Sequence, residues 1–389
     1  MTISSLMKLQ DVNIRSKYRK PTPDEPLWVV LDAGNSDVKA MLYGAYGEEI
    51  VFPQMVRKVA GAEYQTLQQT YRYKRAQFEG SSIFESGGQG YVVGQHATGV
   101  GSGIQLAGAQ KYRRDHLGAI LEAVLIQLSP TDHNDVHVVI MHPPGINTEN
   151  IKDLMDALKG VHRIEVADGR PLVYKVREII PLEEPVAALQ TFLLTQDGHS
   201  YKNLPIKLRP GATFLTVDVG GWISVMVRCR MDRSGKIETN LATAIPIQAG
   251  IQNVLATLQA ELKNAYPVEL ARLQNIPRQI MNDALIDGET IYIKGVAYGC
   301  KAQIDNAMQA IGAPIRQEFT TRFEEGVSDV AIVVSGGGGG TSGDYLKEHV
   351  LNHPSIFAAE PDKEYMRFGA IRGASKGLTP WFAQGKANV

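Results

Sequence analysis

Residues 28–44, WVVLDAGNSDVKAMLYG, contain two apolar runs separated by a short polar segment. The first run, Trp28–Leu31, ends at Asp32, and Gly34 follows in the polar segment. Apolar runs on either side of a glycine-containing turn predict a β-hairpin. The second run carries a single lysine, Lys39. A plain hairpin turn needs neither the carboxylate nor the lysine, so we expect both side chains to have a chemical role.

A second stretch, FLTVDVGGWISVMV at residues 214–227, repeats this pattern 186 residues later. The aspartate, glycine and lysine of the first stretch align with Asp218, Gly220 and Val225, so the lysine belongs to the first copy alone. A strand–Asp-x-Gly–strand unit in each half of the chain predicts two duplicated domains that face one cleft.

The two hairpins together favour a clamp for the phosphates of a nucleotide. Glycines let backbone N–H groups approach phosphate oxygens closely. Lys39 can supply a positive charge, and Asp32 and Asp218 can hold Mg²⁺ through its water ligands. For either hairpin alone, an ordinary turn with a surface aspartate is the alternative.

Two further motifs agree with a nucleotide site. The glycines of IVVSGGGGGTSGDYL, residues 332–346, stand between an expected strand and an expected helix, and they favour a bare surface for an adenosine over a flexible linker. In PLEEPVAALQTF, residues 181–192, Glu183 and Glu184 precede a helix. Acidic residues at such a place usually stabilise the helix N-terminus, but one of them could orient the water that attacks a γ-phosphate.

The amino-acid composition limits the cellular compartments and the classes of binding partner that we expect for this protein. The chain has 389 residues, of which 44% are hydrophobic and 21% charged, as expected for a globular protein with room for two domains. Its net charge of −1 gives no reason to expect direct contact with nucleic acid or an anionic membrane. Two isolated cysteines indicate a reducing compartment, and no apolar run reaches the roughly 20 residues of a membrane span. We therefore predict a cytoplasmic protein.

Hydrophobic patterns predict an α/β architecture in which strands and helices alternate. We expect one strand over 48–56 and helices over 245–265 and 293–312. The predicted organisation is a flexible N-terminal arm, with a docking arm as the alternative, then domain I, completed by a C-terminal helix, and domain II. The respective residues are 1–26, 27–185 with 370–389, and 186–369.

The motifs resemble those of the actin/sugar-kinase/chaperone ATPase superfamily, in the order phosphate 1, connect 1, phosphate 2 and adenosine. Within it, the short first hairpin and the segment YMRFGAIRGASKGL, residues 365–378, are similar to the ParM-type plasmid-segregation actins and their archaeal relatives. The resemblance extends from Trp28 to the C-terminus. The four motifs are LDAGNSDVK (31–39), EEPVAAL (183–189), VDVGG (217–221) and VSGGGGG (334–340).

This resemblance implies two ribonuclease-H-like domains in the actin-like ATPase fold, with a nucleotide cleft between them. It implies ATP, or GTP as the alternative, together with Mg²⁺ held by Asp32 and Asp218. Glu184 would orient the hydrolytic water, and Asp218 would share in catalysis. The nucleotide-binding residues are Asp32, Gly34, Asn35, Ser36 and Lys39 in the first loop, Asp218, Gly220 and Gly221 in the second, and Gly336, Gly337 and Gly338 in the adenosine loop.

One part of the pattern departs from the family. Its members usually follow the second Gly-Gly with serine or threonine, and often with an aspartate a few residues later. Here Trp222 and Ser224 occupy this stretch. We expect the contacts of this loop with the β- and γ-phosphates, and the rate of hydrolysis, to differ accordingly.

The function implied is an ATPase that polymerises head to tail into dynamic filaments and segregates plasmid DNA through a DNA-bound adaptor protein. A small-molecule kinase on the same fold is one alternative, because a fold does not fix a function. A nucleotide-gated scaffold that forms no filament is another. The absence of a basic stripe agrees with an adaptor that carries the DNA contact.

Overall fold

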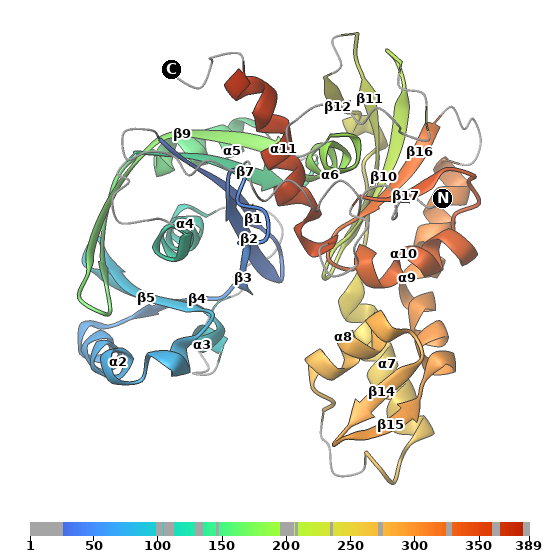
Figure 1. The fold of residues 1–389 in the computed structure, drawn as a ribbon, viewed down its shortest axis with the longest axis horizontal. Helices are drawn as coiled ribbons and strands as arrows, with labels where there is room; N and C mark the ends of the chain where they lie inside the picture. Colours follow the sequence, from blue (N-terminus) through green and yellow to red (C-terminus); the bar gives the residue numbers. More distant parts are fainter. Residues whose placement is uncertain are drawn as a thin grey trace. The chain divides into compact units, whose positions relative to one another are not determined.

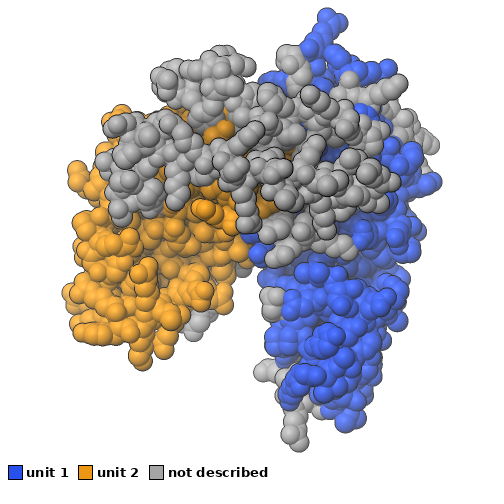
Figure 2. All heavy atoms as spheres, viewed as in Figure 1, with its two compact units in different colours: residues 1–4, 188–193, 200–370 blue, residues 5–187, 194–199, 371–389 orange. Residues whose placement is uncertain are grey.

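The computed structural model describes residues 26–98, 104, 113–128, 135–144, 148–194, 206, 209–233, 236–270, 275–323, 329–359 and 366–383. The arm predicted over 1–26 lies outside these residues, apart from Pro26. The chain divides into two compact units (Figure 2). Unit 1 comprises residues 1–4, 188–193 and 200–370, and unit 2 comprises residues 5–187, 194–199 and 371–389.

Unit 2 contains a mixed sheet of nine strands in the order β3-β2-β1-β7-β9-β8-β5-β6-β4. Strand β1 pairs antiparallel with β2, which confirms the predicted hairpin, and parallel with β7, which is in turn parallel to β9. The strands are β1 (Leu27–Ala33), β2 (Asp37–Leu42), β3 (Ile50–Pro53), β4 (Val56–Val59), β5 (Ser81–Ser86), β6 (Gln89–Gly94), β7 (Asp135–His142), β8 (Gly160–Val166) and β9 (Pro171–Glu183).

The sheet of unit 2 curves around one apolar helix, α4 (Figure 1). Because α4 packs against strands from both ends of the curve, nearly all of its central residues are buried. Every residue of β1 is buried too, since both faces of this strand are covered. Helix α4 comprises Arg114–Leu128. The other helices of this unit are α2 (Gly61–Tyr73), η1 (Arg75–Phe78), α3 (Gln95–Thr98), α5 (Thr148–Leu158) and most of α11 (Gly369–Ala383).

Unit 1 repeats the arrangement around its own central strand. Strand β10 lies between antiparallel β11 and parallel β16, as β1 lies between β2 and β7. The registers also match, because Asp32 is opposite Lys39 and Asp218 is opposite Val225. The predicted duplication is therefore confirmed. The strands are β10 (Thr213–Val219), β11 (Ser224–Met231), β12 (Ile237–Thr239), β13 (Ile245–Ile247), β16 (Asp329–Ser335) and β17 (Ile356–Ala358), with a separate hairpin of β14 (Thr290–Ile293) and β15 (Val296–Gly299).

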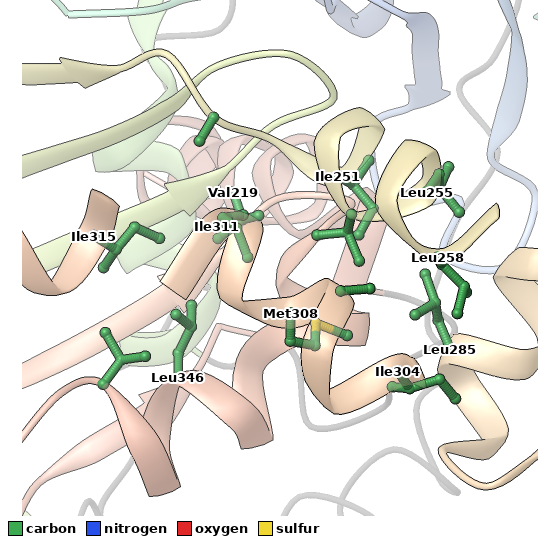
Figure 3. Packing of buried hydrophobic residues seen from close by; sticks show 14 of the residues in the cluster. Val219, Ile251, Leu255, Leu258, Leu285, Ile304, Met308, Ile311, Ile315 and Leu346 are labelled. Atoms are coloured by element: carbon green, nitrogen blue, oxygen red, sulfur yellow. The ribbon is translucent and has the colours of Figure 1, made fainter. Parts of the chain in front are cut away.

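At the end of β10, helices of unit 1 pack around the strand and complete the hydrophobic core. Figure 3 shows Val219 of β10 among side chains of α7, α9 and α10, such as Ile251, Ile311 and Leu346, all of them buried. No helix within the described ranges is long and apolar enough to cross a lipid bilayer. The helices are α6 (Glu184–Leu193, shared with unit 2), η3 (Leu241–Thr243), α7 (Ile251–Ala265), α8 (Arg278–Asp287), α9 (Lys301–Arg322), α10 (Gly339–His349) and η4 (Met366–Phe368).

Three predicted elements differ from the structure. The strand over 48–56 is split into β3 and β4 by an interruption at Gln54 and Met55. The helix over 245–265 begins only at Ile251, after β13. The helix over 293–312 begins only at Lys301, because Lys294 and Gly295 adopt φ values of 52° and 80° and turn the chain into the β14–β15 hairpin.

Helix α11 is fixed to unit 2 by polar contacts with the β2–β3 connection. The Arg372 Nε lies 2.7 Å from Oε1 of Glu49, whose side chain is only 3% exposed. The backbone N–H of Gly44 and the hydroxyl of Tyr46 lie 3.0 and 3.2 Å from the Ser375 Oγ. A buried carboxylate thus depends on one arginine of the last helix.

We expect Arg372→Met to lower the free energy of unfolding by about 3–5 kcal/mol, because it leaves the Glu49 carboxylate buried without its ion-pair partner. Urea denaturation at pH 7, followed by far-ultraviolet circular dichroism, measures this loss. The double variant Glu49→Gln/Arg372→Met removes both charges and should recover most of it. An equal loss in the single and double variants would contradict the importance of the ion pair.

Candidate functional site

Several predicted site residues of unit 2 lie at the carboxyl ends of three parallel strands, β1, β7 and β9, at one edge of the sheet. Asp32 near the end of β1 is opposite Met141 of β7, and His142 at the end of β7 is opposite Glu183 at the end of β9. Glu184 follows as the first residue of α6 and is partly exposed. In α/β sheets this edge is where ligands bind.

Asp32 and Lys39 form a buried ion pair across the first hairpin. The Lys39 Nζ lies 2.9 Å from Oδ2 of Asp32, which is only 6% exposed. Burying a carboxylate is costly unless an opposite charge pairs with it, so the ion pair with Lys39 is what allows Asp32 to be buried. The other oxygen, Oδ1, is buried and has no hydrogen-bond partner in the described part of the chain. Such an orphaned oxygen indicates a missing ligand, ion or water.

The turn after Asp32 leaves space beside both charged groups. A Cβ atom at Gly34 would lie 2.7 Å from the carbonyl oxygen of Asp37, so only glycine fits here. The same Cβ would lie 3.7 Å from both the Asp32 Oδ1 and the Lys39 Nζ. The hydroxyl of Ser36 is a second buried polar group without a partner among the described residues. Asn35 lies between them in the turn.

The second hairpin uses a serine where the first uses a lysine. Asp218 Oδ1 accepts a hydrogen bond of 2.8 Å from the Ser335 hydroxyl, which belongs to the neighbouring strand β16. Gly220 is required by the turn, because a Cβ there would lie 2.4 Å from the carbonyl oxygen of Ile223. Ser335 was not among the predicted residues, although it directly precedes the glycine run.

The N-terminus of α7 holds the loop of the second hairpin. The backbone N–H groups of Ile251 and Gln252 donate to the carbonyl oxygens of Gly220 and Gly221, at 3.1 and 2.9 Å. Gly250 allows this approach, since a Cβ there would lie 2.7 Å from both carbonyl oxygens. Gly250 was not among the predicted residues either, although glycine is one of the residues favoured at a helix N-cap.

Ser224 and Trp222, the two residues that depart from the family pattern, have different surroundings. Ser224 is fully buried, and its hydroxyl donates to the carbonyl oxygen of Ala249 at 2.7 Å. Its hydroxyl is therefore engaged inside unit 1. Trp222, by contrast, is 54% exposed in the loop between β10 and β11.

The glycines after β16 pack against the end of β10. A Cβ at Gly336, where φ is +85°, would lie 2.5 Å from the carbonyl oxygen of Val219, and a Cβ at Gly338 would lie 2.5 Å from the Val219 side chain. Gly337 is exposed, and a Cβ there would meet only the Cβ of Arg367, at 3.6 Å. The guanidinium of Arg367 lies over the Phe368 ring, 4.7 Å from its centre. Gly337 therefore offers the open surface, and Arg367, which the sequence analysis missed, borders it.

The structure brings the predicted residues together within each unit. The first-loop residues and Glu184 belong to unit 2, and the second loop and the adenosine loop belong to unit 1. Among the described residues there is no group of three or more His, Cys, Asp or Glu side chains that could hold a metal ion. Mg²⁺ usually keeps several waters and takes one or two carboxylates, so the orphaned Oδ1 of Asp32 fits such a role.

Comparisons with known proteins agree with this geometry. Residues 31–186 match the family described as actin-like proteins, N-terminal domain. No protein with a curated description matches the chain in sequence. Among solved structures, an archaeal actin homologue in complex with ADP is 17% identical, with a TM-score of 0.66 over 90% of this chain and 99% of the other.

Two bacterial structures are similar as well. ParM of Bacillus thuringiensis with ATP is 13% identical, with a TM-score of 0.63 over 93% of this chain and 100% of the other. A 15-stranded ParM filament from Clostridium botulinum is 14% identical, with a TM-score of 0.61 over 90% of this chain and 99% of the other. The chain therefore has the actin-like fold, and its residues 31–186 are similar to the N-terminal domain of actin-like proteins.

We expect Gly336→Ala to distort the end of β10, because the new methyl group would collide with the Val219 carbonyl and the backbone would be strained at positive φ. Urea denaturation should show a loss of about 1–3 kcal/mol. Gly337→Ala is the matched control, since its Cβ meets nothing closer than 3.6 Å. Equal stability of the two variants would contradict the packing role assigned to Gly336.

Proposed function

We propose that this actin-like protein binds ATP, with GTP as the alternative, through the hairpin loops of both units. The observation that carries the proposal is the buried Asp32–Lys39 pair, with the unpartnered Asp32 Oδ1 and Ser36 Oγ beside the open face of Gly34. Unpaired buried polar groups next to a cation and a glycine turn are what a phosphate with its metal ion requires.

In this proposal each loop has its own task. Lys39 neutralises phosphate charge, and the N–H groups of both glycine turns bind phosphate oxygens. Asp32 and Asp218 hold the waters of Mg²⁺, which adds positive charge at the phosphates when bound. The exposed Gly337 supports the adenosine. Glu184, at the same edge of the sheet as Asp32, orients the water that attacks the γ-phosphate.

The proposed role is that of a cytoplasmic filament-forming ATPase. Head-to-tail contacts between copies of the chain do not close into a ring, so they propagate into a polymer. The similar ParM of Clostridium botulinum is a filament, which supports self-association here. We further propose that hydrolysis weakens these contacts, and that the filament moves plasmid DNA through a DNA-binding adaptor protein.

One observation favours a second candidate, a nucleotide-gated scaffold that binds ATP without turning it over quickly. The Ser224 hydroxyl, the nearest counterpart of the usual Ser/Thr of the second loop, is bonded to the Ala249 carbonyl. A loop without that hydroxyl would have fewer donors for the phosphates. A small-molecule kinase has no such observation in its favour.

Light scattering, pelleting and phosphate release with Mg-ATP, Mg-ADP and no nucleotide test the proposal. We expect ATP-dependent pelleting that decays as phosphate is released. In Glu184→Gln, ATP-dependent pelleting should persist while phosphate release falls about a hundredfold or more, because the water is no longer oriented. Glu183→Gln, at the adjacent residue, is the matched control and should retain phosphate release.

Three results would contradict parts of this account. Phosphate release that is unchanged in Glu184→Gln would remove this residue from its role. Binding of ATP without pelleting and without phosphate release in the wild type would favour the scaffold. Phosphate transfer only to an added small acceptor, without pelleting, would replace the filament with a kinase.

A further inference from the structure

Arg57 is a buried arginine in unit 2, on a strand that takes no part in the proposed nucleotide site. It belongs to β4, the last strand in the sheet order, six places away from β1. Arg57 is opposite Val92 of β6 and shares a strand face with Val59. Both valines belong to a buried apolar cluster that includes residues of α2, η1 and α3. The arginine therefore points into an apolar layer, and it is only 4% exposed.

The guanidinium of Arg57 is only partly satisfied. Its Nη1 donates to the carboxylate of Glu63 on α2, and that carboxylate is 44% exposed. Its Nε and Nη2 are buried and have no hydrogen-bond partner in the described ranges. These two nitrogens form the side edge of the guanidinium, where two parallel N–H groups point in the same direction.

This edge has the geometry that binds an oxyanion. Two parallel N–H donors match the two oxygens of a carboxylate or of a phosphate, and the paired bonds are charge-assisted. An arginine side chain keeps its proton in proteins, so it cannot relieve the cost of burial by becoming neutral. A buried cation with two unpaired donors therefore calls for an acceptor.

We propose that Arg57 binds a small oxyanion, a phosphate or a carboxylate, through Nε and Nη2. The site lies on the face of β4 that packs against α2, η1 and α3; among the described residues, β4 pairs with β6 and, at Val56, with Ile104. Glu63 holds the opposite side of the guanidinium, and this fixes the direction in which the free edge points. The site is independent of the proposed nucleotide loops.

His96 of α3 supplies a reporter of this site. Burial, and secondly the positive charge of Arg57, lower the pKa of His96 below its usual value. An anion bound to Arg57 would cancel that charge, so the pKa of His96 should rise on binding. By reciprocity, the anion should bind more tightly as the pH falls and His96 becomes protonated. Glu63 is the other charged group at Arg57.

The test is the thermal midpoint of the full chain in sodium phosphate or sodium acetate against sodium chloride at equal ionic strength. An anion that binds only the folded state raises the midpoint. We expect phosphate, acetate or both to stabilise the wild type. Arg57→Met should weaken this binding by about tenfold or more, because it removes both donors, and Arg57→Lys should weaken it too, because it lacks the fork. Glu63→Gln should retain the binding or tighten it, because it removes a nearby negative charge.

Controls separate this site from other effects of phosphate. The double variant Asp32→Asn/Lys39→Met, which removes the cation of the first hairpin without leaving a buried charge unpaired, should keep the gain from the Arg57 site, whereas general salt effects would raise the thermal midpoint of all variants alike. Histidine NMR should show the pKa of His96 rising with the stabilising anion in the wild type but not in Arg57→Met. Arg57→Met should fold in chloride at least as well as the wild type, since it removes a buried charge. An equal gain in the wild type and Arg57→Met, or no gain with either anion, would overturn the proposal.

Discussion

A carboxylate buried at the tip of the first hairpin sets the main constraint on this protein. Asp32 lies near the end of a strand that is covered on both faces, so its charge must be balanced within the fold, and Lys39 on the antiparallel strand balances it. The register of one hairpin thus decides whether the strand can be buried. Gly34 keeps the space beside the pair open, and the pair lies at the carboxyl edge of the sheet.

The second hairpin also has an aspartate, Asp218, but a hydroxyl group contacts it in place of a lysine. Ser335 hydrogen-bonds Asp218, and the N-terminus of α7 binds the carbonyl groups of Gly220 and Gly221. Unit 2 therefore contributes the cation, whereas unit 1 contributes glycine loops fixed by backbone contacts. These two contributions suit the proposed nucleotide, because its phosphates need a positive charge nearby and its adenosine needs a surface without side chains.

The repeat of 186 residues predicted both hairpins, because a short strand–turn–strand unit is decided by local residues. Errors arose where local pattern was ambiguous: the alternation in β15 and the short β13 both resembled helix starts. Gly250 and Arg367 escaped notice because they contact Gly220, Gly221 and Gly337, which are distant from them in sequence. Arg57 escaped notice because its burial among apolar side chains is not visible in the sequence. The predicted domain limits and the roles of the site residues stay predictions.

The central claim is that both hairpins serve one nucleotide. Isothermal titration of Mg-ATP into the wild type, Asp32→Asn and Asp218→Asn tests it most directly. The account predicts one nucleotide per chain in the wild type, and binding weakened by about tenfold or more in each variant, because each removes one carboxylate from the metal. Two nucleotides per chain, or full affinity in either variant, would contradict it.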